Sequence, residues 1–478
     1  MNARTVAAIA AGKAAAAASR LLGRGGGTAI AGLVALRIDP GLVRRLTVQV
    51  GAGTIAVTGT NGKTTTSLML SRIAAAAAKR PLHNRSGSNL MRGVAAMLVE
   101  EATLAGAIPD GPQRLAILEV DEATLPEIGR AVAPGVIVFT NLFRVQLDRY
   151  GEVDAVAASW ERALAGSGFG AAGRPQPTLV LNADDPAVAH LGRAYGGRVV
   201  YYGIDDTTAG GAGDDHASDF RTCLSCGEEI AYTTTFYGHI GHWRCLACGN
   251  ARPSPEVRVT RVAPGDDATA LTIDSPDGEL AMSLPLAGLY NAYNALAAAA
   301  GALALGLSRE AIVAALDGFS AAFGRQERFS VDGRHVRVLL GKNPTGLNQV
   351  LRTMAVSQDV GAAGDPALLR IVFFLNDGIA DGRDVSWIWD ADYETVQPRT
   401  AWALAAGTRA EDLALRLKYA GFGDDVAVER HTAAALRRGL DATPTGATLY
   451  VVPTYTAMLE ARELLAKRAG AGKFWEGG

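Results

Sequence analysis

The sequence predicts an α/β protein with two doubly wound parallel sheets and a small four-cysteine insert in the first of them. Short apolar runs of strand length alternate with helical patterns, and a glycine-rich turn joins one run to a helix. All four cysteines fall between positions 223 and 248. Strands that alternate with helices are typical of parallel sheets covered on both faces. At roughly 150 residues per domain, the 478 residues suggest about three domains.

The composition is that of a globular protein. Hydrophobic residues make up 49 % of the chain and charged residues 20 %, which excludes an intrinsically disordered chain. Lys and Arg total 46 against 48 Asp and Glu, a net charge of −2, so no overall basic field favours nucleic acid or an anionic membrane surface. Four clustered cysteines also exclude a disulfide scaffold for most of the chain.

Residues 1–50 are predicted to form a helical lead-in. The alanine-rich stretch 6–22 has the pattern of an amphipathic helix that docks against the domain that follows. A secretory signal fits poorly because Lys13, Arg20 and Arg24 interrupt the apolar stretch. No uncharged apolar run reaches the ~18 residues of a spanning helix, so no transmembrane segment is expected.

Residues 51–317 are predicted to form the first α/β unit. An insert at about 205–255 interrupts its pattern with glycine, aspartate and cysteine. The predicted strands are 54–57, 115–118, 135–139 and 178–181, and the predicted helices are 67–78 and 291–307.

Residues 318–478 are predicted to form a second, C-terminal α/β unit of Rossmann-like type. Strands are expected at 336–340, 368–375, 401–405 and 448–452, with a helix at 410–419.

A candidate phosphate loop follows the first predicted strand. It reads Gly59-Thr60-Asn61-Gly62-Lys63-Thr64-Thr65. Glycines let backbone N–H groups close around phosphate oxygens, and the helix N-terminus adds a favourable dipole. Lys63 would reach the β- and γ-phosphates and the Thr64 hydroxyl would bind Mg²⁺. The first glycine of the general pattern is replaced by Val57, and the alternative is a glycine-rich turn capped by threonines.

The loop sequence T-G-T-N-G-K-T-T resembles the ATP loop of the Mur ligase family, the ligases of peptidoglycan synthesis and their folylpolyglutamate synthetase relatives. The resemblance implies ATP and Mg²⁺ as cofactors, with catalytic roles for Lys63 and Glu119, the latter a magnesium ligand at a strand end. It implies nucleotide contacts from Asn291, Asn294 and Arg325 as well as from the loop. Taken singly, Glu119 could be a solvated strand end, Asn291 a helix cap and Arg325 a surface ion pair.

The cysteines have the spacing of two zinc knuckles. They are Cys223, Cys226, Cys245 and Cys248, two C-x-x-C pairs eighteen residues apart. Four thiolates at this spacing are typical of one tetrahedral zinc with a structural role. Gly227 and Gly249 permit the tight turn after each pair. A redox role is the alternative, and His239 or His242 could replace a cysteine as ligand.

A distinctive run follows the predicted strand 368–375. Residues 376–390 contain four aspartates and two of the six tryptophans, and they could form an Asx-rich loop in which Asp384 caps a short helix and the tryptophans are buried. Together with Lys342-Asn343-Pro344 and 453–456, the run resembles the amidating branch of the Mur ligase family.

That resemblance implies a ligase subunit of lipid II isoglutaminyl synthase. Such a subunit phosphorylates the α-carboxylate of D-glutamate in the lipid II stem peptide, and ammonia converts the acyl phosphate to D-isoglutamine. The ammonia comes from a GatD-type glutamine amidotransferase in a heterodimer, and Asp384 would orient the histidine of its Cys-His pair. The resemblance places the reaction in the cytoplasm, at the inner face of the plasma membrane. A chain whose four cysteines all hold zinc independently points to a separate glutaminase.

One departure and two alternatives stand beside this interpretation. Val145 occupies a position where the branch usually has aspartate, so no metal or polar role transfers to it. An amino-acid-adding ligase of the folylpolyglutamate synthetase kind would lack the zinc insert and the Asp384 run. A zinc-ribbon ATPase that binds nucleic acid is disfavoured by the net charge and by the acidic flanks of the insert, which are Asp214, Asp215, Asp219, Glu228 and Glu229.

Overall fold

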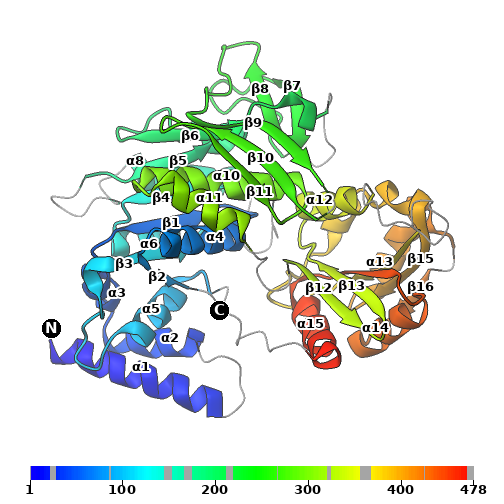
Figure 1. Cartoon of the computed structure of the whole chain (residues 1–478), viewed down its shortest axis with the longest axis horizontal. Helices are drawn as coiled ribbons and strands as arrows, with labels where there is room; N and C mark the ends of the chain where they lie inside the picture. Colours follow the sequence, from blue (N-terminus) through cyan, green and yellow to red (C-terminus); the bar gives the residue numbers. More distant parts are fainter. Residues whose placement is uncertain are drawn as a thin grey trace.

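The structure is a computed structural model of the chain. We describe residues 2–21, 28–84, 88–144, 153–165, 169, 175–211, 219–265, 267–319, 325–355, 368–424 and 426–470. Within these ranges the strands form sheets of nine, six and two strands. Figure 1 shows the nine-stranded sheet with its helices on the left, the six-stranded sheet on the right and the two-stranded hairpin at the top. The predicted α/β class with a separate C-terminal α/β unit is confirmed.

The strand order of the nine-stranded sheet is β11-β10-β9-β6-β5-β4-β1-β3-β2. Its strands are parallel from β2 to β9, and β10 and β11 are antiparallel. The strands are β1 (Thr54–Thr58), β2 (Arg80–His83), β3 (Arg114–Glu119), β4 (Val136–Phe139), β5 (Thr178–Asn182), β6 (Val199–Ile204), β9 (Val257–Pro264), β10 (Thr269–Asp274) and β11 (Leu280–Leu284). The predicted strands coincide with β1, β3, β4 and β5 to within a residue.

Helices cover both faces of this sheet. Ile55 and Val57 of β1 enter one hydrophobic core, and Ala56 between them enters the core on the other face. This alternation makes β1 an uninterrupted apolar run, as expected of a central parallel strand. The helices are α3 (Leu42–Thr47), α4 (Lys63–Ala76), α5 (Met91–Glu101), α6 (Leu125–Val132), α8 (Val153–Ala165), α9 (Pro186–His190), α10 (Leu289–Ala304) and α11 (Arg309–Asp317).

Two further helices, α1 (Ala3–Leu21) and α2 (Thr28–Ile38), precede this unit. The predicted helix 6–22 corresponds to α1, which packs with α2 against α5 through Ala8, Ile9 and neighbouring residues. In the described part of the chain, no helix combines the length and the apolar character needed to span a bilayer.

The six-stranded sheet has the order β12-β13-β17-β14-β15-β16, with only the β12–β13 pair antiparallel. Its elements are β12 (Arg325–Val331), β13 (Arg334–Leu339), α12 (Pro344–Ala355), β14 (Leu369–Phe374), β15 (Thr400–Ala406), α13 (Ala410–Leu417), β16 (Ala427–Glu429), α14 (Thr432–Asp441), β17 (Thr448–Val452) and α15 (Tyr455–Ala469). Helix α12 lies between the two large sheets (Figure 1).

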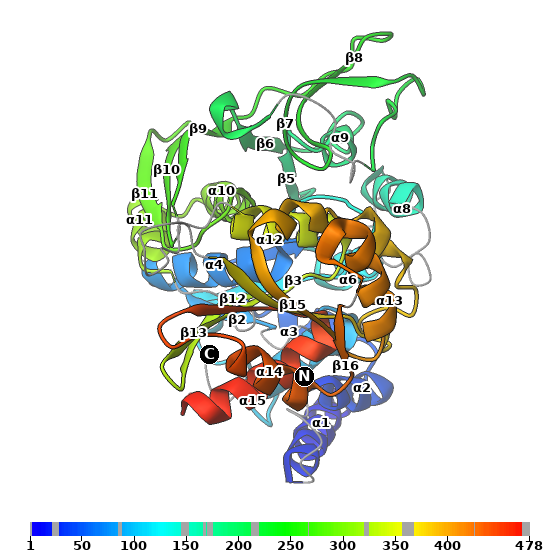
Figure 2. The same ribbon diagram turned by 90° about the vertical axis from the view of Figure 1, so that its right-hand side faces the viewer.

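The insert forms an antiparallel hairpin of β7 (Ile230–Tyr237) and β8 (Ile240–Cys245). It lies at the end of the molecule opposite α1 (Figures 1 and 2). The indole Nε1 of Trp243 donates to the carbonyl oxygen of Ala183 at 3.0 Å. The backbone N–H of Gly241 donates to the carbonyl oxygen of Asp184 at 2.9 Å. The hairpin is therefore fastened to the segment that follows β5.

Candidate functional site

The phosphate loop adopts a conformation that requires its glycines. Gly59 has φ +127° and Gly62, the N-cap of α4, has φ +86°, both in the region that favours glycine. A Cβ at Gly59 would collide with the Thr140 hydroxyl, and one at Gly62 with the Asn294 side chain. Helix α4 therefore begins at Lys63, four residues before its predicted start, with its N-terminus at the loop.

Residues at the end of β4 hold the loop in place. The Thr60 hydroxyl accepts a hydrogen bond from the backbone N–H of Phe143 at 2.9 Å. The backbone N–H of Asn61 donates to Asn141 Oδ1 at 2.8 Å, and the Thr140 hydroxyl donates to the Asn61 carbonyl at 2.8 Å. Thr140 and Asn141 thus act as supports of the loop.

Lys63 is buried beneath the loop. Its Nζ donates to the carbonyl oxygens of Gly59 and of Thr60, the latter at 3.2 Å. It also forms an ion pair with Glu122 Oε2 at 3.1 Å, and both side chains are less than 10 % exposed. Glu122 is a site residue that sequence reasoning missed, although it lies three positions after Glu119.

Glu119 and Thr64 meet at the carboxyl end of β3. The Thr64 hydroxyl donates to Glu119 Oε1 at 3.0 Å. Among the described residues, Glu119 Oε2 is buried and has no hydrogen-bond partner, and the side chain is only 4 % exposed. A solvated strand end is therefore the wrong interpretation. A buried carboxylate oxygen without a partner, beside a hydroxyl, fits the oxygen ligands that Mg²⁺ prefers.

A pocket opens between the phosphate loop and the C-terminal unit. From the loop and α10 it is lined by Asn61, Gly62, Thr65, Asn291 and Asn294. Asn294 Nδ2 donates to Asn291 Oδ1 at 3.2 Å, and both asparagines lie inside α10, whose N-cap is Gly288. The helix-cap alternative for Asn291 is therefore wrong. The structure brings these predicted nucleotide residues together on one wall.

The opposite wall comes from residues that sequence reasoning did not assign to this site, although Lys342 belongs to a run that it singled out. They are Leu339, Leu340, Lys342, Thr345, Gly346, Gln349 and Val350, and Asn141, Tyr237, Leu286 and Tyr290 complete the lining. Asn343 Nδ2 donates to Asn61 Oδ1 at 3.0 Å, which ties α12 to the phosphate loop. The buried Nε2 of Gln349 has no hydrogen-bond partner within the described residues. A buried donor of this kind fits a polar ligand such as a nucleotide.

The structure does not describe the side chains at two positions considered from the sequence. Val145 lies outside the described residues, as does the side chain of Arg325, whose backbone begins β12. Asp185, which follows β5, accepts from the backbone N–H groups of Ala187 and Val188 and therefore caps α9. Its Oδ2 also accepts from the backbone N–H of Leu142 at 2.8 Å, which ties α9 to the segment after β4.

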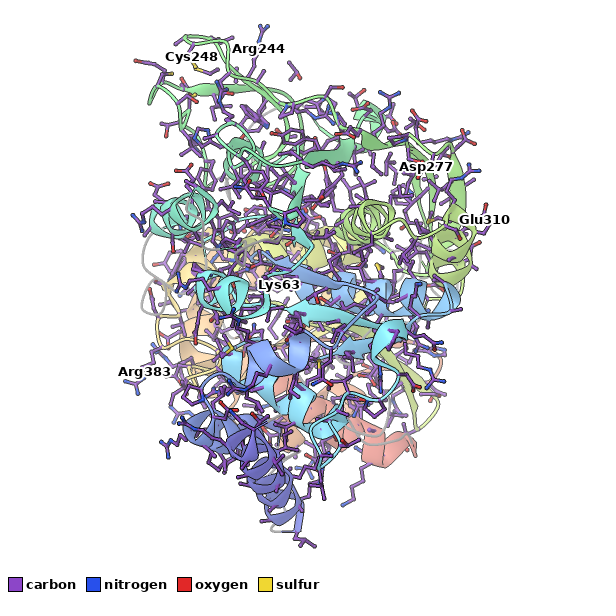
Figure 3. The ribbon with its side chains drawn as sticks, turned by 90° about the vertical axis from the view of Figure 1, so that its left-hand side faces the viewer. Lys63, Arg244, Cys248, Asp277, Glu310 and Arg383 are labelled. Atoms are coloured by element: carbon purple, nitrogen blue, oxygen red, sulfur yellow. The ribbon has the colours of Figure 1, made fainter. Side chains whose placement is uncertain are left out.

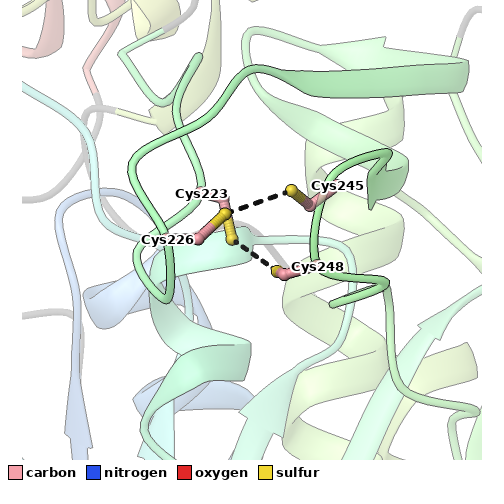
Figure 4. Close-up of side chains that lie close together, drawn as sticks. All are labelled: Cys223, Cys226, Cys245 and Cys248. Carbon is pink, nitrogen blue, oxygen red and sulfur yellow. Dashed lines mark hydrogen bonds between the residues drawn. The ribbon is translucent and has the colours of Figure 1, made fainter.

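The four cysteine sulfurs converge at the open end of the hairpin (Figure 4). All lie within 4.8 Å of one another, and the closest pairs are Cys223–Cys248 at 3.6 Å and Cys226–Cys245 at 3.5 Å. Sulfurs bound to tetrahedral zinc at about 2.3 Å are about 3.8 Å apart, so the cluster fits zinc. Gly227 and Gly249 have φ of +81° and +73°, as the knuckle turns require.

The histidines near the cluster are not among its members. His242 contacts the Ile204 carbonyl at 2.7 Å through Nε2, and the fully buried His239 lies 3.4 Å from Asp185 Oδ2. Burial raises the pKa of Cys223, but hydrogen bonds from Ser225 and Asn250 outweigh it and lower that pKa to about 6. A thiolate at neutral pH is the form that binds metal.

Asp384 lies on a partly exposed loop after β14 and does not line the pocket. Its Oδ1 accepts from the backbone N–H of Ser386 at 2.8 Å, and the hydrogen bonds with Ser386 lower its pKa. The neighbouring Asp381 is buried and accepts from the backbone N–H of Thr456 at 2.8 Å, which fixes the loop to the start of α15. Figure 3 shows Arg383 pointing outward at the edge of the molecule, whereas Lys63 lies inside.

Apolar side chains are exposed beside this loop. Ile379 is 79 % exposed, Tyr419 70 % and Trp389 49 %, so the alternative in which both tryptophans are buried is wrong. The rings of Trp389 and Tyr419 are in edge contact, with centroids 5.7 Å apart. The segment that carries Asp384 thus also carries exposed Trp389, whose ring contacts exposed Tyr419.

Comparison with known proteins places the chain in a family. Residues 57–302 match the Mur ligase middle domain and residues 340–458 the MurT ligase C-terminal domain. The subunit MurT of lipid II isoglutaminyl synthase (glutamine-hydrolyzing) from Staphylococcus aureus (strain COL) is 32 % identical over 465 residues, which cover 95 % of this chain and 96 % of that protein. Its namesake from Streptococcus pneumoniae is 30 % identical and is matched over 98 % of each chain.

Solved structures show the same fold at lower identity. A pseudomurein peptide ligase type C from Methanothermus fervidus has a TM-score of 0.64 at 21 % identity, covering 88 % of this chain and 80 % of that one. MurF from Acinetobacter baumannii has a TM-score of 0.63 at 20 % identity, covering 91 % and 81 %. The full-length relatives and the two matching domains together show that this chain belongs to the MurT family of Mur ligases.

Proposed function

We propose that this chain is the ligase subunit of a lipid II isoglutaminyl synthase. It transfers the γ-phosphate of ATP to the α-carboxylate of D-glutamate in the lipid-linked stem peptide. Ammonia then attacks the acyl carbon, phosphate leaves, and D-isoglutamine forms. The observation that carries this proposal is the pocket between the phosphate loop and α12, in a chain aligned over its length with MurT proteins.

The chemistry needs an activated carboxylate, because a free carboxylate is a poor electrophile. Phosphorylation converts one of its oxygens into part of a leaving group. The Lys63 ammonium, close to the loop, offsets negative charge as the phosphoryl group moves. Thr64 and Glu119 would hold Mg²⁺, which supplies further charge neutralisation at the phosphates. Asn61, Thr65, Asn291 and Asn294 would hold the nucleotide.

The ammonia source is proposed to be a separate glutaminase of the GatD type. All four cysteines of the sequence belong to the cluster that could hold a metal ion, so no thiol is left for glutamine hydrolysis. Asp384 and the exposed Trp389 and Tyr419 support a docking face for that partner on the C-terminal unit. We propose three domains, 1–50, 51–317 and 318–478, because the strands of the two large sheets lie within 54–284 and 325–452.

The test is amidation of lipid II by the purified chain in vesicles with ATP. With ammonium as nitrogen donor the chain alone should amidate lipid II and release ADP and phosphate. With glutamine as donor, it should do so only after a GatD-type subunit is added. Glutamine-driven amidation by the chain alone, or inactivity with ammonium in the assembled complex, would contradict the proposal.

A further inference from the structure

The tip of the cysteine-bearing hairpin reaches the nucleotide pocket. The cysteines lie at the open end of β7 and β8, where Ile230 pairs with Cys245. The turn at the other end, Tyr237 to Ile240, lies about 25 Å away along an eight-residue strand. Tyr237 is 3 % exposed and is one of the pocket-lining residues, so the insert contributes a side chain to the pocket itself.

Two further contacts connect the tip to parts of the candidate site. The Phe143 ring stacks on Tyr237 with centroids 6.0 Å apart and lies 4.4 Å from the His239 ring, and its backbone N–H donates to Thr60 in the phosphate loop. Tyr237 also meets Tyr293 edge-on at 5.6 Å. Tyr293 stands between the two pocket asparagines of α10 and donates to Asp184 at 2.6 Å.

We propose that the hairpin tip is a wall of the nucleotide pocket, with Tyr237 a nucleotide-binding residue, and that metal at the four cysteines maintains this wall. The inference rests on the proposed function, since it assumes that the pocket takes ATP. Its physical basis is that two short strands alone are marginally stable, whereas a closed Cys₄ site folds such an insert. The cysteine cluster, though distant from the pocket, therefore supports nucleotide affinity.

The first test measures binding of a non-hydrolysable ATP analogue with Mg²⁺ by calorimetry, using the full chain. Tyr237→Ala should weaken binding by about tenfold, as expected for loss of an aromatic contact to a nucleotide, with zinc content unchanged. Thr233→Ala is the control, because Thr233 is in the same strand but is exposed and does not line the pocket. Its affinity for the ATP analogue should lie within about twofold of that of the unaltered chain.

The second test follows hydrogen–deuterium exchange before and after zinc is removed with a chelator. Exchange should accelerate at 237–241 and at the phosphate loop, 59–62, but not in α14. Changes confined to the two knuckles would overturn the role of the metal. Equal affinity of Tyr237→Ala and the unaltered chain, or equal loss in Tyr237→Ala and Thr233→Ala, would overturn the role of Tyr237. If the unaltered chain binds no nucleotide, the proposed function itself fails.

Discussion

Replacing Lys63 by methionine is expected to reduce ATP-dependent amidation by about a thousandfold or more with either nitrogen donor. Lys63 Nζ lies beside the loop carbonyls, where the phosphates of a bound nucleotide would converge on the N-terminus of α4. Loss of one positioned charge at a phosphoryl-transfer site removes stabilisation that solvent does not replace. Phosphate release in the presence of lipid II and ammonium measures the effect.

The Lys63→Met variant alone also leaves Glu122 buried without its cation. Breaking a buried ion pair costs about 3–5 kcal/mol of stability, so poor folding could imitate a catalytic loss. The double variant Lys63→Met/Glu122→Gln removes the unpaired charge and should recover most of the thermal stability while staying inactive. Recovery of activity together with stability would show that Lys63 has a structural role only.

Asp384→Asn is expected to separate the two nitrogen donors. On the proposed function, glutamine-driven amidation by the complex should fall by about two to four orders of magnitude, because the Asp384 carboxylate would hold the partner's histidine and an amide would not. Ammonium-driven amidation should change little, since Asp384 does not line the nucleotide pocket. The depressed pKa of Asp384 keeps it ionised at neutral pH, as this role requires. Paired assays with glutamine and with ammonium measure the ratio of the two amidation rates in the variant and in the unaltered chain.

Asp277→Asn is a matched control for that substitution. Asp277 is an exposed aspartate of the nine-stranded unit, between β10 and β11, and its loss should alter neither reaction. Equal loss of both reactions in Asp384→Asn would reject a role restricted to glutamine hydrolysis. Unchanged glutamine-driven activity would reject any role in the partner's triad.

Local sequence patterns predict the features that depend on local physics. Strand β1 can be predicted because its apolar residues face both cores. The phosphate loop can be predicted because the backbone conformation at positions 59 and 62 favours glycine. The cysteine spacing predicts a cluster because short knuckles bring thiolates together without help from distant residues.

The features that sequence reasoning missed depend on distant contacts. Gln349 and Val350 line the pocket only because α12 packs beside the phosphate loop, a placement that no local pattern encodes. In the sequence, Tyr237 cannot be distinguished from other aromatic residues in strands. Its place in the pocket depends on the contact of the hairpin with Tyr293 of α10. Strand β9 could not be predicted from the sequence, because exposed residues such as Arg261 interrupt its pattern of apolar positions.

The fate of the carboxylate oxygen is the most direct test of an acyl phosphate intermediate. Lipid II carrying heavy oxygen in the D-glutamate α-carboxylate is converted with ATP and ammonium, and the phosphate released is analysed by mass spectrometry. One heavy oxygen atom should appear in each phosphate, because the carboxylate oxygen that accepts the phosphoryl group leaves with it. Phosphate without heavy oxygen, or label recovered in AMP, would contradict activation of the carboxylate by phosphoryl transfer.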